Sequence, residues 1–246
     1  MKPLYFLTAC LFLFAACRKD TVEQGTMELE FRNVAGNQPL TLNTATYQNA
    51  EGENFTISAF KYYLSNFSLV KMDNSEVKLP AAYFLVDQAN EASRVIKLAA
   101  PKGEYRAVKF LVGVDSTRNV SGAQTGALDV VHGMFWSWNS GYIMAKLEGY
   151  SPASTAPENR LTFHIGGFRK ENSAIQEVLL TAPISLTVES GRLPQLMIDA
   201  DALAWFNQPF PIKFATTSTI HVPGEDAAKI AANYRNMFRI TSVTDL

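Results

Sequence analysis

The chain has 246 residues, of which 47% are apolar and 18% are charged, and its formal net charge is −1. This apolar share excludes a disordered chain, and the sequence has neither the glycine period of collagen nor the heptads of a coiled coil. There is no basic excess to attract phosphate backbones, which argues against nucleic-acid binding.

The N-terminus has the pattern of a bacterial signal peptide. Met1-Lys2-Pro3 is a short basic start, and residues 4–16 are almost all apolar, a stretch too short to span a bilayer. Leu13-Phe14-Ala15-Ala16-Cys17 resembles a lipobox, with Phe where Leu is usual. The resemblance implies cleavage before Cys17 and its lipidation, and several acyl chains on one residue suffice for stable anchoring.

The two cysteines are Cys10, inside the expected signal peptide, and Cys17. If Cys17 carries lipid, the mature chain has no thiol for a disulfide, a zinc site or a nucleophile. A soft-metal site would then use histidine, methionine or a modified aromatic side chain. We expect a signal peptide over 1–16, a lipidated cysteine with a polar tether over 17–26, and one domain over 27–246. Secretion with a free thiol at Cys17 is the alternative.

Beyond the tether, short segments in which apolar and polar residues alternate predict strands. The segments are Met27 to Phe31, Ala59 to Met72, Tyr83 to Val86, Val108 to Val114, Ile143 to Leu147, Leu161 to Ile165, Ile184 to Val188, and Leu196 to Ile198. Turn residues separate them and no helical period is interleaved, which favours an all-β fold. We expect a single-domain antiparallel β-sandwich of two packed sheets. Its expected core includes Phe60, Leu64, Phe110, Val112 and Phe163.

Two helices are expected late in the chain. Residues 199–207 can form two turns, with Asp201 as the N-cap. Residues 225–238 place apolar side chains at helical spacing after Pro223-Gly224. We expect this second helix to be the longest and to cover one end of the sandwich.

Catalytic motifs are mostly absent. There is no nucleophile elbow, no His-Glu-x-x-His motif, no phosphate loop and no dinucleotide fingerprint. Residues 115–119, Asp-Ser-Thr-Arg-Asn, have the composition of a calcium loop without the spacing of an EF-hand, so a capped turn after a strand is favoured. We expect a protein that is not an enzyme.

The most unusual segment covers residues 132–142, His-Gly-Met-Phe-Trp-Ser-Trp-Asn-Ser-Gly-Tyr. If it is extended, one face carries His132, Met134, Trp136 and Trp138. Neighbours on such a face are about 7 Å apart, so the two ends of this row cannot share a metal unless the glycine bends the chain. A buried aromatic strand beside a glycine turn is the simpler interpretation.

Several segments match a known pattern. They are Phe60-Lys61-Tyr62-Tyr63-Leu64-Ser65-Asn66, Gly113-Val114-Asp115-Ser116, Gly126-Ala127-Leu128-Asp129, the run from Gly133 to Tyr142, Lys146-Leu147-Glu148-Gly149, and Phe163-His164-Ile165-Gly166-Gly167. Together they resemble the MbnP-like copper-binding family (the methanobactin-associated periplasmic copper protein type), from about Glu28 to Phe238. The resemblance implies a periplasmic or surface protein that binds copper. It also implies that MbnH, a di-haem partner of the bacterial peroxidase type, oxidises one tryptophan to kynurenine. The family also includes lipoproteins, which is consistent with the expected lipidation of Cys17.

The three histidines of the mature chain are the candidates for the copper site that the resemblance implies. The family pattern places a histidine in the contexts of His164 and His221, and His132 is the third candidate. Copper accepts imidazole nitrogen, but the three are far apart in sequence, so only the fold can bring them together. Oxidation of Trp136 or Trp138 would open the indole to an aryl amine and a ketone, which converts a donor-only side chain into a metal ligand.

The expected function is therefore that of a lipid-anchored protein, at the outer membrane or the periplasmic face, that holds copper without turnover. The alternative is a metal-free β-sandwich lipoprotein that binds a glycan or a partner protein through exposed Trp136, Trp138 and Tyr142. Geometry separates the two. Copper binding requires His164 and His221 to converge near the aromatic segment, whereas the alternative requires a flat, exposed aromatic platform.

Overall fold

The structure, a computed structural model, describes residues 23–122, 124–137 and 140–245. The expected signal peptide, Cys17 with its expected lipid, and Trp138 lie outside the described residues. In the described part of the chain, every helix is too short or too polar to span a lipid bilayer.

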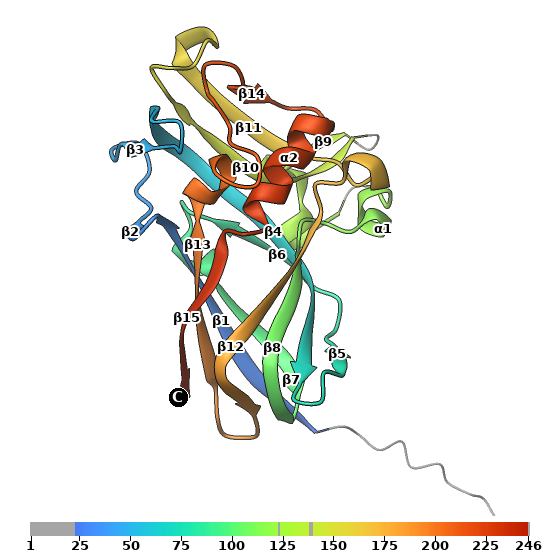
Figure 1. The fold of residues 1–246 in the computed structure, drawn as a ribbon. Coiled ribbons are helices and arrows are strands. Elements are labelled where there is room, and N and C mark those ends of the chain that lie inside the picture. Colours follow the sequence, from blue (N-terminus) through green and yellow to red (C-terminus); the bar gives the residue numbers. More distant parts are fainter. Residues whose placement is uncertain (1–22, 123, 138–139, 246) are drawn as a thin grey trace, which may run out of the picture.

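Two β-sheets form the framework (Figure 1). The smaller sheet follows the order β15-β13-β1-β2, and β7 also pairs with β1. Its strands are β1 (Gln24–Ala35), β2 (Gln38–Pro39), β7 (Val95–Pro101), β13 (Pro194–Asp201) and β15 (Phe238–Asp245). The larger sheet follows the order β12-β8-β4-β10-β11-β14, with four short strands attached to it. Its strands are β3 (Tyr47–Gln48), β4 (Asn54–Lys71), β5 (Glu76–Lys78), β6 (Tyr83–Asp87), β8 (Gly103–Val112), β9 (Phe135–Ser137), β10 (Gly141–Tyr150), β11 (Arg160–Gly166), β12 (Gln176–Val188) and β14 (Thr219–Ile220).

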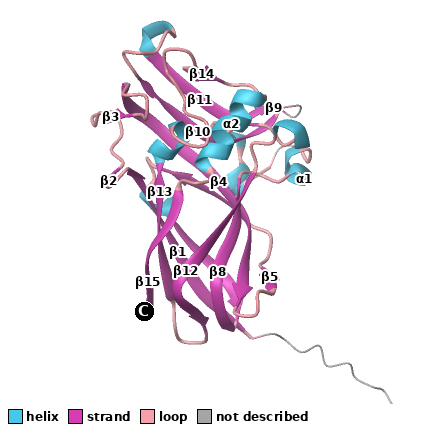
Figure 2. Ribbon diagram, viewed as in Figure 1, coloured by secondary structure: helices cyan, strands magenta, loops and turns pink. Residues whose placement is uncertain are grey.

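The helices are short and gather in the half of the molecule that holds β10 and β11 (Figure 2). The α-helices are α1 (Ser116–Asn119) and α2 (Glu225–Tyr234), and the 3-10 turns are η1 (Glu91–Arg94), η2 (Gly126–Leu128), η3 (Val130–His132), η4 (Pro157–Asn159), η5 (Lys170–Asn172) and η6 (Ala202–Phe206). The capped turn expected at residues 115–119 is α1, whose first turn is closed by the Asp115 side chain accepting from the Arg118 N–H.

Strand β4 joins the two halves of the molecule (Figure 1). Its first half pairs with β10 from Thr56 to Tyr62, and its second half pairs with β8 from Leu64 to Lys71. Because one continuous strand serves both halves, β10 and β11 are held on the same framework as β8 and β12.

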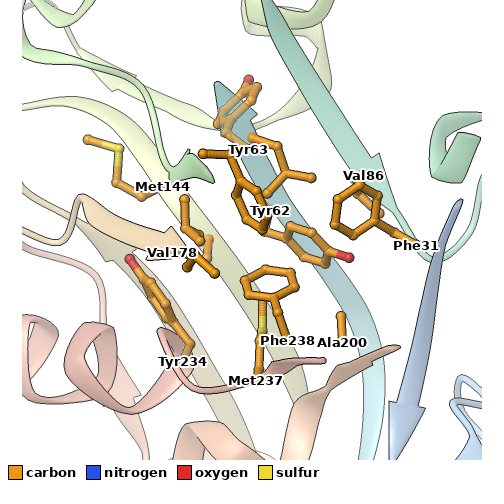
Figure 3. Close-up of a cluster of buried hydrophobic side chains, with 14 of the residues drawn as sticks. Phe31, Tyr62, Tyr63, Val86, Met144, Val178, Ala200, Tyr234, Met237 and Phe238 are labelled. Carbon is orange, nitrogen blue, oxygen red and sulfur yellow. The ribbon is translucent and has the colours of Figure 1, made fainter. Parts of the chain in front are cut away.

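The core lies between the two sheets and continues between the larger sheet and α2 with η6, where Phe163 packs on Phe206. All five residues expected there are buried, namely Phe60, Leu64, Phe110, Val112 and Phe163. Figure 3 shows Phe31, Tyr62 and Phe238, from three different strands, gathered in one aromatic cluster. The rings of Tyr62 and Phe238 meet edge to face with centroids 5.7 Å apart, a geometry that adds about 0.5–1.5 kcal/mol to the burial term.

The all-β prediction is confirmed, but the sheets are mixed. Strands β1 and β13 run parallel, as do β11 and β14, and the remaining pairs are antiparallel. Two of the longer strands, β7 and β15, were not expected from the sequence, nor were the short strands β2, β3, β5 and β14. Strand β1 also starts at Gln24, inside the expected tether, because residues 24–26 pair with β7. Ile184, expected in a core-facing alternation, is 58% exposed because the β12–β8 register shifts between Thr181 and Leu186.

The two helix predictions are right in position and wrong in extent. Helix α2 is the longest described helix, but it ends at Tyr234, and Phe238 begins β15 because its ring enters the aromatic core and its backbone pairs with β13. Residues 199–201 belong to β13, and only Ala202–Phe206 turns as a 3-10 helix. Asp201 caps it as expected, its carboxylate accepting from the Leu203 N–H.

The two ends of the molecule differ in what they carry. Strand β1 begins at the end of the molecule away from β9, β14 and α2 (Figure 1). The expected lipid anchor therefore precedes a strand that starts far from the histidine-bearing strand β11.

Candidate metal centre

Strand β11 presents His164 on its outer face. Leu161, Phe163 and Ile165 are buried, whereas His164 between them is only partly buried. Because side chains alternate along a strand, Gly166 shares the outer face with His164.

His164 contacts a carboxylate on the neighbouring strand. Its Nε2 lies 2.6 Å from Oε1 of Glu148 on β10, and the His164 ring is the largest cause of a lowered pKa for Glu148. An ionised carboxylate only accepts hydrogen bonds, so Nε2 must be the donor. In the neutral ring, Nδ1 then carries the free lone pair.

Lys146 lies directly opposite His164 in the β10–β11 register. Its Nζ donates to the Gly133 carbonyl at 2.7 Å and lies 3.7 Å from Glu148 Oε1. Burial lowers the pKa of Lys146, whose side chain is only 13% exposed. Lys146 thus joins β10 to the turn that precedes β9.

His221 directly follows β14, the strand that pairs with β11. In the parallel β11–β14 pair, Thr162 is opposite Thr219 and Phe163 is opposite Ile220. Phe163 and Ile220 both face the core, so the residues that follow them start on the outer side. Adjacent strands are about 4.8 Å apart, which brings the His164 and His221 backbones close together across a long stretch of sequence.

Trp136 lies against the same strand. Strand β9 pairs with β10, and the six-membered ring of Trp136 packs on Gly166, where an added Cβ would lie 2.5 Å from Cζ3. The absence of a side chain at Gly166 therefore makes room for the indole, two residues along β11 from His164.

His132 is placed differently from the other two histidines. It ends η3, and the left-handed Gly133, with φ of 65°, turns the chain before β9. The segment is therefore not extended at this point, and His132 does not share the face that a continuous strand would have given it. Its Nε2 lies 3.0 Å from the Gly126 carbonyl, so the ring is directed to the turn at residues 126–128.

Tyr142 does not belong to an exposed aromatic platform. It is fully buried, its hydroxyl donates to the Leu128 carbonyl at 2.8 Å, and its ring meets Tyr63 edge to face. This part of the glycan-binding alternative is wrong, because the register shift in the β9–β10 hairpin puts Tyr142 in the core.

The donor set suits copper only in part. Within residues 23–122, 124–137 and 140–245, no three or more His, Cys, Asp or Glu side chains are grouped so that they could hold a metal ion. The outer face of β11 offers the His164 imidazole, a ligand type that suits copper, with the Trp136 indole nearby on Gly166 and with His221 following the adjoining strand β14. A third ligand would have to come from a different kind of group.

The sequence prediction did not include Glu148 and Lys146 among the site residues. Both are polar residues of the alternating β10 segment, and their side chains point to the other face of the sheet from those of Ala145 and Leu147. The sequence therefore predicts the face of the sheet on which Glu148 and Lys146 lie. It does not predict that they lie next to His164, because the pairing of β10 with β11 is a property of the whole sheet.

The fold and this face define the class of the molecule, an all-β protein with a partly buried histidine on the outer side of a sheet strand and a tryptophan packed nearby. The MbnP family model matches residues 24–222, and the chain belongs to the MbnP family. MbnP from Methylosinus trichosporium has a similar structure, with a TM-score of 0.54 over 83% of this chain and 84% of that chain. The two are 16% identical, so this likeness concerns the fold. A comparison with curated proteins finds no match.

Proposed function

We propose that this protein binds copper on the outer face of β11 through the imidazoles of His164 and His221, and that it holds the ion without catalysing a reaction. The observation that carries the proposal is the parallel register of β11 and β14, in which Phe163 and Ile220, the residues just before these two histidines, are paired. Imidazole nitrogen is a good copper ligand, and two such donors on paired strands need little ordering before they bind.

We infer that an oxidised tryptophan completes the site. Trp136 supports this because it packs on Gly166, on the face that carries His164. Opening its indole yields an aryl amine and a ketone, groups that can ligate a metal where the intact indole only donates. In this proposal a di-haem enzyme of the MbnH type catalyses the oxidation, a peroxide is the oxidant and is reduced to water, and the indole C2 leaves as formate. Trp138 is the alternative position for the modification.

The proposed setting is a lipid-anchored protein at the outer membrane or the periplasmic face. The lipobox-like segment before Cys17 supports the anchor. The position of the β1 start, at the end of the molecule away from β9 and β14, supports a copper face that stays accessible to a partner protein (Figure 1).

Competition titration with a chromophoric Cu(I) chelator tests the site. His164→Ala and His221→Ala should each weaken binding by at least about tenfold, or 1.4 kcal/mol. His132→Ala is the matched control and should retain most of the affinity, because its ring contacts the Gly126 carbonyl instead. Equal affinities for all three variants and the wild type would contradict the proposal.

Mass spectrometry of the protein from its native host tests the modification. A kynurenine at residue 136 or 138 is the expected result. Copper that binds with full affinity to protein in which both tryptophans are intact would contradict the role given to the modified side chain. No observation on the described residues favours the glycan-binding alternative, since Tyr142 is buried.

A further inference from the structure

The contact between His164 and Glu148 determines which ring nitrogen is free. Glu148 Oε1 is 2.6 Å from Nε2 of His164, a distance typical of a strong charge-assisted hydrogen bond. Because the carboxylate is an acceptor only, the proton must sit on Nε2. Nδ1 is then the ring nitrogen whose lone pair is available to coordinate a metal ion.

The direction of that lone pair follows from the sheet. Glu148 is on β10 and stands opposite Thr162, whereas Lys146 stands opposite His164. The Nε2 edge of the ring is therefore turned toward β10 and toward residue 162. The two nitrogens of an imidazole point in diverging directions, so Nδ1 points away from the Glu148 carboxylate. The surroundings of His164 other than β10 include β14, which is followed by His221, and the Gly166 position on which Trp136 packs.

Lys146 places an ammonium near the same carboxylate oxygen. Its Nζ is 3.7 Å from Oε1 and is itself fixed by the Gly133 carbonyl at 2.7 Å. The Glu148 oxygen thus faces an imidazole N–H on β11 and an ammonium on β10, which restricts the rotamers that the side chain can adopt. A restricted carboxylate in turn restricts the orientation of the ring that it binds.

We propose that Glu148 is a positioning residue that presents His164 to copper through Nδ1. The proposal rests on the proposed function, since it specifies how one ligand of that copper site is oriented. Glu148 itself does not bind the ion. Carboxylates that accept from the second nitrogen of a ligating histidine fix its tautomer and orientation, and their removal typically costs about 10–100-fold in metal affinity.

Two-bond ¹H–¹⁵N correlation spectra of the ¹⁵N-labelled full-length protein, in detergent, can report both ring nitrogens of His164. In the metal-free protein we expect Nε2 to be protonated and Nδ1 to be unprotonated. On addition of Cu(I), which is diamagnetic, the Nδ1 signal should shift and Nε2 should stay protonated. Protonated Nδ1 in the metal-free protein, or copper on Nε2, would overturn the inference.

Three variants distinguish the orientation of the His164 ring by Glu148 from a general effect of losing a negative charge. Glu148→Ala should weaken Cu(I) binding by about 10–100-fold and leave both His164 tautomers populated. Glu148→Gln keeps an acceptor oxygen in place and should restore the single tautomer and most of the affinity. Glu158→Gln removes a carboxylate near the start of β11 that pairs with Arg160 instead, and should change neither readout.

The outcomes also distinguish this inference from the proposed function. If the wild type does not bind Cu(I), or if His164→Ala does not weaken Cu(I) binding, the proposed function is wrong, and so is the proposed ligation through Nδ1. If copper binds through His164 but Glu148→Ala changes neither the tautomer nor the affinity, the positioning role is wrong and the proposed function stands.

Discussion

Gly166→Ala tests the contact that places Trp136 on β11. An added Cβ would lie 2.5 Å from Cζ3 and 2.8 Å from Cη2 of Trp136, and 2.9 Å from the Tyr142 carbonyl oxygen. Ordinary contacts of this kind are 3.4–4 Å, so the indole must move by about 1 Å or the strands must part. Overpacking of this kind costs about 1–3 kcal/mol. Alanine recovers about 0.4–1 kcal/mol by restricting the unfolded chain, which leaves a net loss of about 1–2 kcal/mol.

Thermal unfolding followed by near-UV circular dichroism measures this loss. At about 2–4 °C for each kcal/mol in a chain of this size, the midpoint should fall by about 2–8 °C. Gly224→Ala is the matched control, because nothing lies within 4 Å of an added Cβ and its backbone is extended. Repeating Gly166→Ala in a Trp136→Ala background should remove most of the effect. If Gly166→Ala is as stable as the wild type, Trp136 does not pack on β11 and the proposed site loses its aromatic member.

Three further predictions concern the fold and its anchoring. Asn233→Ala should lower the free energy of unfolding in urea by about 2–4 kcal/mol, because the buried Asn233 amide bonds the backbones of Trp205 and Phe210, while the exposed Asn236→Ala serves as control. Burial and the hydrogen bond to Asp115 raise the pKa of Tyr83 from 10.0 to about 12. Between these values the unfolded chain loses a proton that the folded chain keeps, so stability should fall as the pH rises from 10 to 12. Five more tyrosines with a pKa raised by burial should steepen the fall, and a flat stability curve over this range would contradict the assignment. Cys17→Ser should move the protein from the membrane pellet to the soluble fraction, and a variant that still pellets would disprove lipid anchoring.

The alternation of side chains determined the class of fold and much of the core. Phe31 in β1 and Phe163 in β11 are recognisable as core residues from their own strands, because period-two burial is a local property of the chain. The caps at Asp115 and Asp201 were equally local, since each carboxylate bonds a backbone N–H two or three residues away. The end of α2 was not, because Phe238 fits a helical pattern as well as the start of a strand.

The tertiary structure alone decided the neighbours of the candidate site. His164 could be assigned to an outer face from sequence, but its contacts to Glu148 and its place beside His221 depend on β11 lying between β10 and β14. Strand pairing and register are set by the packing of the whole sheet, and alternation within one strand carries no information about either. Likewise, the bend at Gly133 separates His132 from the strand, and the bulge in β10 buries Tyr142. The sequence thus determined which residues are candidate copper ligands, and the pairing of the strands determined which side chains surround them.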